Sequence, residues 1–260
     1  MLSAPLPYSI AFEEYVRNRH EVIELLHAVP SDTEQIHSNK KRELANALYR
    51  ASVVLLSSHL ERYIESLVVE AIDAINFAMP TVDQLPELLR LTQIEQSLRA
   101  VHSAVSDPRD PDKVLDKREM INKVQAFKAF LDDYDYFFND SQPCTKLNVN
   151  ILIDRFSNPS PHKIVHLFRQ FGFHNVVQRA ISRESKPDKA NIEGMVNELI
   201  EKRNAIAHTG MTTNLTRENI IVYLRYSRRL VRGIDTIVGQ EVEKIVGKWP
   251  WDTSFLLGSP

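Results

Sequence analysis

The chain has 260 residues, of which 43% are hydrophobic, and its formal net charge is −2 at pH 7. It contains no run approaching the roughly 20 consecutive apolar residues of a membrane-spanning helix, and its first residues lack the basic and apolar regions of a secretory signal, so we expect a cytoplasmic protein. Its single cysteine, Cys144, excludes an internal disulfide and a cysteine zinc cluster.

In the first half of the chain, apolar residues recur with the period of an α-helix, and prolines and capping residues mark the helix ends. Ser31 and Asp32 are good N-caps for a long second helix. The helices predicted here are residues 9–28, residues 31–78 with a break near 36–39, residues 81–104 and residues 112–131.

The second half begins with a stretch that is harder to assign. Residues 132–140 mix acidic and aromatic side chains and are predicted as a loop. Residues 141–160 are interpreted as an irregular connector, although alternating apolar residues at 147–153 are also typical of a short strand. Helices are predicted after it at residues 161–171, 174–184, 188–208 and 216–247, with Gly210 as a stop after the third of them.

These elements predict an all-α bundle that forms one domain over residues 1–260. Residues 80–150 are interpreted as additional helices inserted between the early core helix and the helix at 188–208. The aromatic tail at residues 248–257 has two open interpretations. It either covers the core of its own chain or is a docking strip for a partner.

The most informative segment is the end of the helix at 188–208, which carries Arg203, Asn204 and His208. Arginine is a permanent cation, an imidazole exchanges a proton near neutral pH, and an asparagine amide orients its neighbours. Asn204 and His208 lie one helical turn apart, on the same edge of the helix, and the long Arg203 side chain can reach that edge. This set suits chemistry at a phosphodiester. The plain alternative is a surface salt bridge beside a capping histidine.

This Arg-Asn-x-x-x-His pattern near a helix end resembles the Arg-x4–6-His signature of the HEPN superfamily. Upstream, Leu60 and Glu61 within residues 51–64 resemble the Leu-Glu pair of the family's early core helix. Residues 158–161 (Asn-Pro-Ser-Pro) are similar to the start of a helix in the RiboL-PSP-type branch. The resemblance covers about residues 40–245, and it implies a HEPN-like helical bundle.

Many HEPN proteins are metal-independent RNases, so the resemblance implies an endoribonuclease that needs no cofactor and leaves cyclic-phosphate ends. His208 would carry protons, Arg203 would contact phosphate oxygens through its guanidinium, and Asn204 would orient the imidazole or the phosphate. One histidine does not easily act as both base and acid, and the family resemblance implies a homodimer that brings two motifs into one cleft. It also suggests a bacterial toxin–antitoxin or antiviral defence setting, with an antitoxin or defence partner that restrains the enzyme.

Glu61 is predicted to support this site. A carboxylate on an otherwise apolar helix needs a partner if it is buried, and Arg203 is the partner we expect. The alternative is an exposed glutamate that pairs with a neighbour on the surface.

The charge of the chain is unevenly distributed. Residues 1–140 hold 15 Lys and Arg against 23 Asp and Glu, whereas residues 141–260 hold 17 against 11. The last predicted helix carries a basic stripe, which is either a solvated face or a track for the RNA backbone. The stripe consists of Arg225, Arg228, Arg229 and Arg232.

The glycines exclude one class of function. All seven lie at or beyond Gly172, so the first 171 residues have no phosphate-cradling loop or dinucleotide fingerprint. Two alternatives to the enzyme stay open. One is a non-catalytic HEPN-like module that binds RNA, nucleotide or a protein partner, and the other is a structural helical adaptor.

Overall fold

The computed structural model describes residues 8–94, 121, 122, 125, 128, 143, 144, 147–154, 156–209 and 214–251. Within these residues the protein is all-α, and the one pairing of extended backbone is an isolated bridge between Thr81 and Pro143. The predicted fold class is therefore confirmed. No helix in this part of the chain combines the length and the apolar character that crossing a membrane requires.

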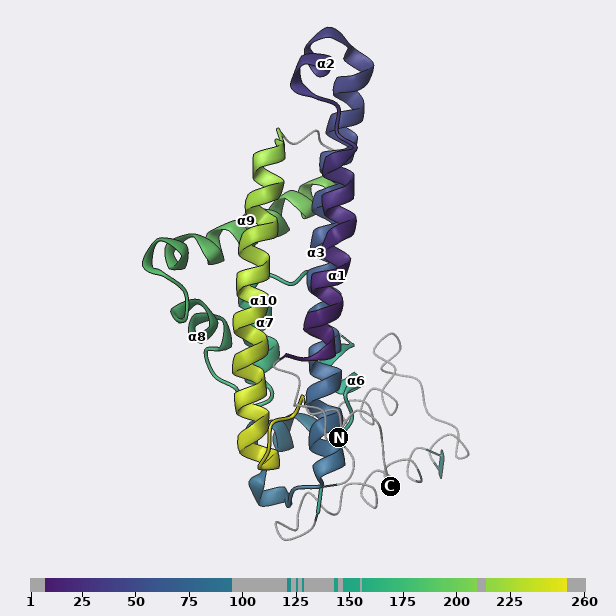
Figure 1. Ribbon diagram of the computed structural model, residues 1–260. Helices are drawn as coiled ribbons and strands as arrows, with labels where there is room; N and C mark the ends of the chain where they lie inside the picture. The colour runs from purple at the N-terminus through teal and green to yellow at the C-terminus, as the bar shows by residue number, and fades with distance from the viewer. Residues whose placement is uncertain are drawn as a thin grey trace, which may run out of the picture.

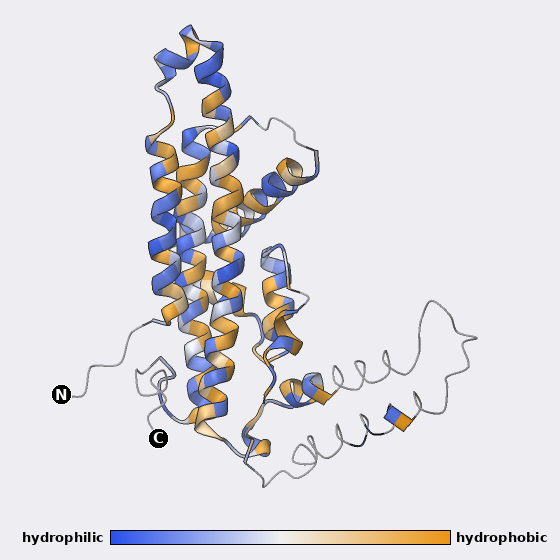
Figure 2. Ribbon diagram, turned by 90° about the vertical axis from the view of Figure 1, so that its right-hand side faces the viewer, coloured by the Kyte–Doolittle hydropathy of each residue, from blue (hydrophilic) through white to orange (hydrophobic). Residues whose placement is uncertain are grey.

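Three long helices form the body of the molecule (Figure 1): α1 (Ile10–His27), α3 (Asn39–Ala78) and α10 (Arg217–Val246). α1 and α3 are antiparallel, and α10 starts at the same end of the molecule as α3. The short helix α2 (Asp32–His37) lies in the turn between α1 and α3, beyond the start of α10. Figure 2 shows apolar residues where the long helices meet and mostly hydrophilic residues around α2.

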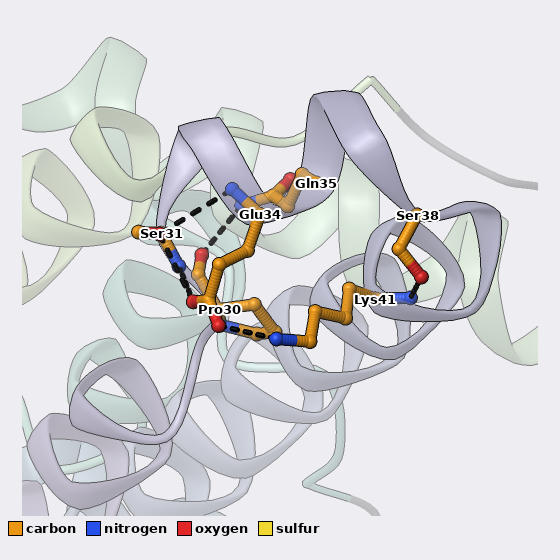
Figure 3. Close-up of polar contacts among 6 residues, drawn as sticks. All are labelled: Pro30, Ser31, Glu34, Gln35, Ser38 and Lys41. Carbon is orange, nitrogen blue, oxygen red and sulfur yellow. Dashed lines mark hydrogen bonds and ion pairs between the residues drawn. The ribbon is translucent and has the colours of Figure 1, made fainter.

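The predicted break in the second helix is confirmed, and local hydrogen bonds explain it (Figure 3). Ser31 caps α2 by accepting from the backbone N–H of Glu34, whose carboxylate accepts in return from the N–H of Ser31 at 3.0 Å. Lys41 pairs with the same carboxylate, and these contacts lower the pKa of Glu34 to about 2. Ser38 then takes an extended conformation and caps α3 through the N–H of Lys41.

The remaining helices pack around these three. They are η1 (Val82–Gln84), a helix at residues 87–94, α6 (Asn150–Ile153), α7 (Pro161–Arg169), α8 (Val176–Ser182) and α9 (Lys186–Thr209). α7, α8 and α9 match predicted helices, whereas α6 lies where an irregular connector was predicted. The helix predicted to run unbroken from residue 81 is wrong at its start. Leu85 is extended, with ψ of 140°, because the following residue, Pro86, disfavours a helical conformation in its predecessor.

The segment at residues 147–153 forms no strand. The Asn148 side chain accepts from the N–H of Asn150 at 3.0 Å, and this local bond opens the turn that becomes α6. Several predictions lie outside the described residues: most of the helix at 112–131, the loop at 132–140 and the stop at Gly210.

Two clusters of buried side chains hold the helices together. The upper core cluster joins α1, α3, α9 and α10, and consists of Val22, Leu26, Val29, Ala45, Tyr49, Val53, Leu56, Leu199, Leu215, Ile220, Tyr223 and Leu224. The lower core cluster is larger and joins the lower parts of α3 and α10 to α6, α7, α8 and the start of α9. The helix that carries the motif therefore contributes to both clusters.

The first part of the aromatic tail packs on its own chain. Trp251 is buried, and its ring meets that of Trp249 edge-on with centroids 6.4 Å apart. Both rings press on Gly239 of α10, where a Cβ atom would lie 2.7 Å from Trp249 Cη2 and 2.7 Å from Trp251 Nε1. A glycine is therefore required at this point of α10. Residues 252–257 of the predicted tail lie outside the described residues.

Two carboxylates from different helices hold the start of α1. The N–H groups of Ile10 and Ala11 donate to Glu70 of α3 at 3.0 and 2.6 Å. The N–H of Ser9 donates to Asp235 of α10 at 3.2 Å, and the Ser9 hydroxyl bonds to the same carboxylate. The first N–H groups of a helix have no partner within the helix, and they attract negative charge. This arrangement satisfies them while it fixes α1 to both neighbours.

The two carboxylates are costly to ionise where they lie. The pKa of Asp235 is raised to about 7, mainly by burial and to a smaller extent by the nearby Glu70, against the lowering effect of the bonds from Ser9. Burial also raises the pKa of Glu70 to about 7, against the lowering effect of the N–H groups of Ala11 and Ile10. The folded state therefore holds protons here that the unfolded chain has already released at the same pH.

This shift predicts how stability depends on pH. The pKa values of Glu70 and Asp235 are higher in the folded state than in the unfolded chain. The stability that these two groups contribute is therefore complete at pH values below their unfolded pKa values, and it is lost as pH rises through about 7. Between about pH 5 and about pH 8, the free energy of unfolding should fall by an amount on the order of a few kcal/mol. Urea unfolding followed by circular dichroism measures it.

Asp235→Asn keeps hydrogen-bonding groups at this position and removes its titration, so it should flatten the pH dependence in part, with Glu70 supplying the remainder. Asp154→Asn is the matched control, because Asp154 is exposed. If the two variants keep the same pH slope, Asp235 is not a source of the effect.

Candidate functional site

The motif helix α9 is held to the bundle by an apolar face that precedes the motif. Leu199 and Ile200 are buried, and Leu199 lies in the upper core cluster. Further along the helix, the half-buried Ile206 still packs against this cluster. The motif segment is therefore docked on the bundle and also borders solvent.

A hydrogen bond between helices adds to this anchoring. The hydroxyl of Tyr223, which is buried on α10, donates to Oε1 of Glu198 on α9 at 2.9 Å. Burial first, and then the Glu198 carboxylate, raise the pKa of Tyr223 well above its usual value. The bond lies little more than one helical turn before Arg203, so it fixes the position from which the motif projects.

The three motif side chains lie at the open end of α9. Arg203 and Asn204 are half-buried, whereas His208 is exposed. Nη1 of Arg203 donates to Oδ1 of Asn204 at 3.1 Å. This contact holds the guanidinium beside the amide and leaves the NH2 group of Asn204 for hydrogen bonds to a ligand. In Figure 1, α9 crosses behind α10 at an angle to the long helices.

The expected pairing of Glu61 with Arg203 is not seen. Within the described part of the chain, Arg203 bonds to Asn204, and Glu61 lies half-buried on α3 with no ion pair to Arg203. The charge of Glu61 acts on its own helix, because burial first and then Glu61 raise the pKa of Glu65. The supporting role of Glu61 stays a prediction.

The basic stripe of α10 lines a groove that it shares with α1. The groove has a volume of about 640 Å³. Its lining combines arginines with apolar side chains, and it contains Arg19, Ile23, Leu26, His27, Glu184, Arg217, Ile221, Leu224, Arg225, Arg228, Arg229 and Arg232. We call this the α1–α10 groove. None of the three motif residues lines it.

The four arginines of the stripe are not equivalent. Arg232 pairs with Glu184 at 2.8 Å, and Arg229 contacts Glu184 at 3.9 Å and pairs closely with Asp188. Arg225 and Arg228 are exposed and form no ion pair with any residue that the structure describes. The stripe therefore has a neutralised part beside the start of α9 and a free part nearer the start of α10.

Arg19 is a groove residue that the sequence analysis missed. Its Nη2 crosses from α1 to donate to the carbonyl oxygen of Leu224 at 3.1 Å. A signal was available in the sequence, because Arg19 falls in the apolar series of α1 between Tyr15 and Val22, where a helix normally buries its side chains. A cation in that series indicates a partner on the facing helix or a ligand.

Comparison with known families identifies the fold. The family model described as RiboL-PSP-HEPN matches residues 13–240. The chain belongs to the RiboL-PSP-HEPN family. This match includes α9, the α1–α10 groove and most of α10, and membership indicates a nuclease-like or RNA-related module.

Two further comparisons gave no relative of this HEPN chain. No curated protein matches it, and no solved structure does.

The bond between Tyr223 and Glu198 predicts how the motif helix is kept in place. Tyr223→Phe removes the donor and leaves Glu198 without this partner, which should cost about 1–3 kcal/mol. Amide hydrogen exchange in residues 197–208 should then become faster, and any activity of the motif should fall. Hydrogen exchange read by mass spectrometry tests this. Tyr226→Phe is the matched control on the same helix, and equal exchange in both variants would contradict the role of this bond.

Proposed function

We propose that this RiboL-PSP-HEPN chain is a metal-independent endoribonuclease. The observation that carries the proposal is the accessible group of Arg203, Asn204 and His208 at the end of α9, with the first two already in contact. Family membership supports it, because the Arg-Asn-x-x-x-His pattern falls within the matched residues. The substrate class is RNA, and the site reads the backbone rather than the bases.

The chemistry needs only proton transfer and charge stabilisation. The ribose 2′-oxygen attacks the adjacent phosphorus, the bond to the 5′-oxygen breaks, and the products are a 2′,3′-cyclic phosphate and a 5′-hydroxyl. A base takes the proton of the 2′-hydroxyl, and an acid returns one to the leaving 5′-oxygen. An imidazole can do either task. Arg203 suits the crowded phosphorane, because its guanidinium binds two oxygens at once.

The proposal includes a homodimer, since two tasks call for two imidazoles. One chain supplies one motif histidine, which lies exposed at the end of α9. A second copy with its motif facing the first would supply the other histidine and a second arginine. The pair would then share one cleft, with one His208 as base and the other as acid.

The first test is cleavage of bulk cellular RNA by the purified chain in excess EDTA. His208→Ala and Arg203→Ala should each lower the rate by about 100-fold or more, because they remove a proton carrier and a charge that stabilises the transition state. His166→Ala and Arg169→Ala are matched controls, since both residues are exposed in the last turn of α7. Circular dichroism shows that each variant is folded.

The other outcomes decide between the alternatives. If no protein cuts RNA but RNA is still retained, the chain is a non-catalytic binding module. If it neither cuts nor retains RNA, a helical scaffold is left. Equal activity of wild type and the His208→Ala variant would refute the assignment of the motif.

A mixing experiment tests the homodimer. Wild-type and His208→Ala chains are mixed, allowed to exchange subunits, and assayed for RNA cleavage. If both histidines are needed, mixed dimers are inactive, and activity should fall below the share of wild-type chains in the mixture. Activity in proportion to that share would show that each motif works alone.

The biological setting in the proposal is a toxin or an antiviral defence effector restrained by an antitoxin or another partner. Such an enzyme should stop growth when it is expressed alone. Relief of that toxicity by His208→Ala would support the setting, and harmless expression of an active wild-type enzyme would count against it.

A further inference from the structure

The α1–α10 groove has an imbalance of charge that the proposed cleavage chemistry does not use. Among the residues that the structure describes, six arginines line it against a single carboxylate, that of Glu184. Glu184 is already paired with Arg229 and Arg232. The free cations of the groove therefore have no counter-charge among its lining residues.

The Arg19 guanidinium is fixed in position by one hydrogen bond and keeps a donor available for a ligand. Its Nη2 donates to the carbonyl oxygen of Leu224 at 3.1 Å, which ties the guanidinium to α10. Its Nε is buried and has no hydrogen-bond partner within the described residues. A buried N–H without a partner is unfavourable, so this side chain is fixed in position with an unmet donor.

Arg228 adds a second cation near Arg19. Burial lowers the pKa of Arg19, the nearby Arg228 lowers it further, and Tyr15 acts in the opposite direction. Tyr15 does not balance this charge as an anion, because burial raises the pKa of its hydroxyl to about 12 and keeps it neutral. Two cations held close together repel each other, and a bound anion would relieve that repulsion.

Apolar side chains next to these cations narrow the class of anion. Ile23 and Leu26 of α1 and Ile221 and Leu224 of α10 line the same groove. A volume of about 640 Å³ is that of a site for a small organic molecule or for a short part of a chain. A ligand that combines phosphate with a flat apolar group fits this lining better than a bare inorganic ion.

We propose that Arg19, Arg225 and Arg228 form a phosphate-binding site in the α1–α10 groove for a ribonucleotide. The phosphate belongs either to an RNA strand or to a free nucleotide. Arg229 and Arg232 are not part of the proposed site, because they already form ion pairs with Asp188 and Glu184. The site goes beyond the proposed function, since none of its residues belongs to the motif. Only the case in which the ligand is an RNA strand rests on the proposed function.

The test measures binding in full-length chains that carry His208→Ala, so that cleavage does not affect the result. Fluorescence anisotropy follows a labelled short single-stranded RNA and, separately, a fluorescent ATP analogue. Arg225→Gln with Arg228→Gln should weaken binding of the true ligand about tenfold or more for each arginine. For RNA, the slope of log Kd against log salt should also fall by about 0.7 for each phosphate that the variant no longer neutralises.

The matched control is Arg42→Gln with Arg169→Gln, which removes the same charge from two exposed arginines outside the groove. Loss of binding confined to RNA assigns the site to an RNA strand, and loss of binding for the ATP analogue, with inorganic phosphate a poor competitor, assigns it to a free nucleotide. No binding of either probe, or an equal loss in the control, overturns the proposal. Because cleavage is assayed separately, either result is independent of whether the chain is a nuclease.

Discussion

The start of α1 is fixed by carboxylates from two different helices, and much of the functional surface depends on this contact. Glu70 of α3 and Asp235 of α10 meet the free N–H groups at residues 9–11. They set both the height of α1 along the bundle and its rotation. Arg19 lies ten residues after Ser9, or about 15 Å along the helix, so the same contact brings it opposite Leu224. A shift of α1 by one residue would turn Arg19 away from α10.

Both candidate sites depend on α10, each through different side chains of that helix. α10 holds the motif helix through Tyr223 and Glu198, and it forms the groove with α1 through its arginines. Arg229 also links the groove to the motif helix, because it pairs with Asp188 in the first turn of α9. α10 is therefore the common support for a site suited to proton transfer and a site suited to holding phosphate.

The sequence predicted well where local rules decide the structure. Ser31 and Thr216 mark helix starts because their side chains cap the backbone that follows, and both capping boxes are present. The break before α3 and the end of α10 at Gly247, with φ of 78°, are also local. The periodicity of apolar residues did not predict the break at Leu85, because the steric effect of Pro86 on its predecessor overrode it.

What the sequence did not predict depends on how helices are rotated against one another. Glu61 and Arg203 are on neighbouring helices, yet the side chain that Arg203 meets is Asn204 of its own helix. Arg229 and Arg232 were grouped with Arg225 and Arg228 by spacing alone. Their acids, Glu184 and Asp188, lie more than 40 residues away in the chain, and spacing along one helix carries no information about such partners.

The contact between Gly239 and the two tryptophans also bears on how this family changes during evolution. A side chain at position 239 would occupy the space of both indole rings, so the packing of the two rings depends on the glycine. Among related chains, we expect this glycine to covary with the tryptophans at positions 249 and 251. Lineages that lose the aromatic pair are free to place a larger residue on α10. An alignment of the family would then record the loss of this tail as a change in the middle of a helix.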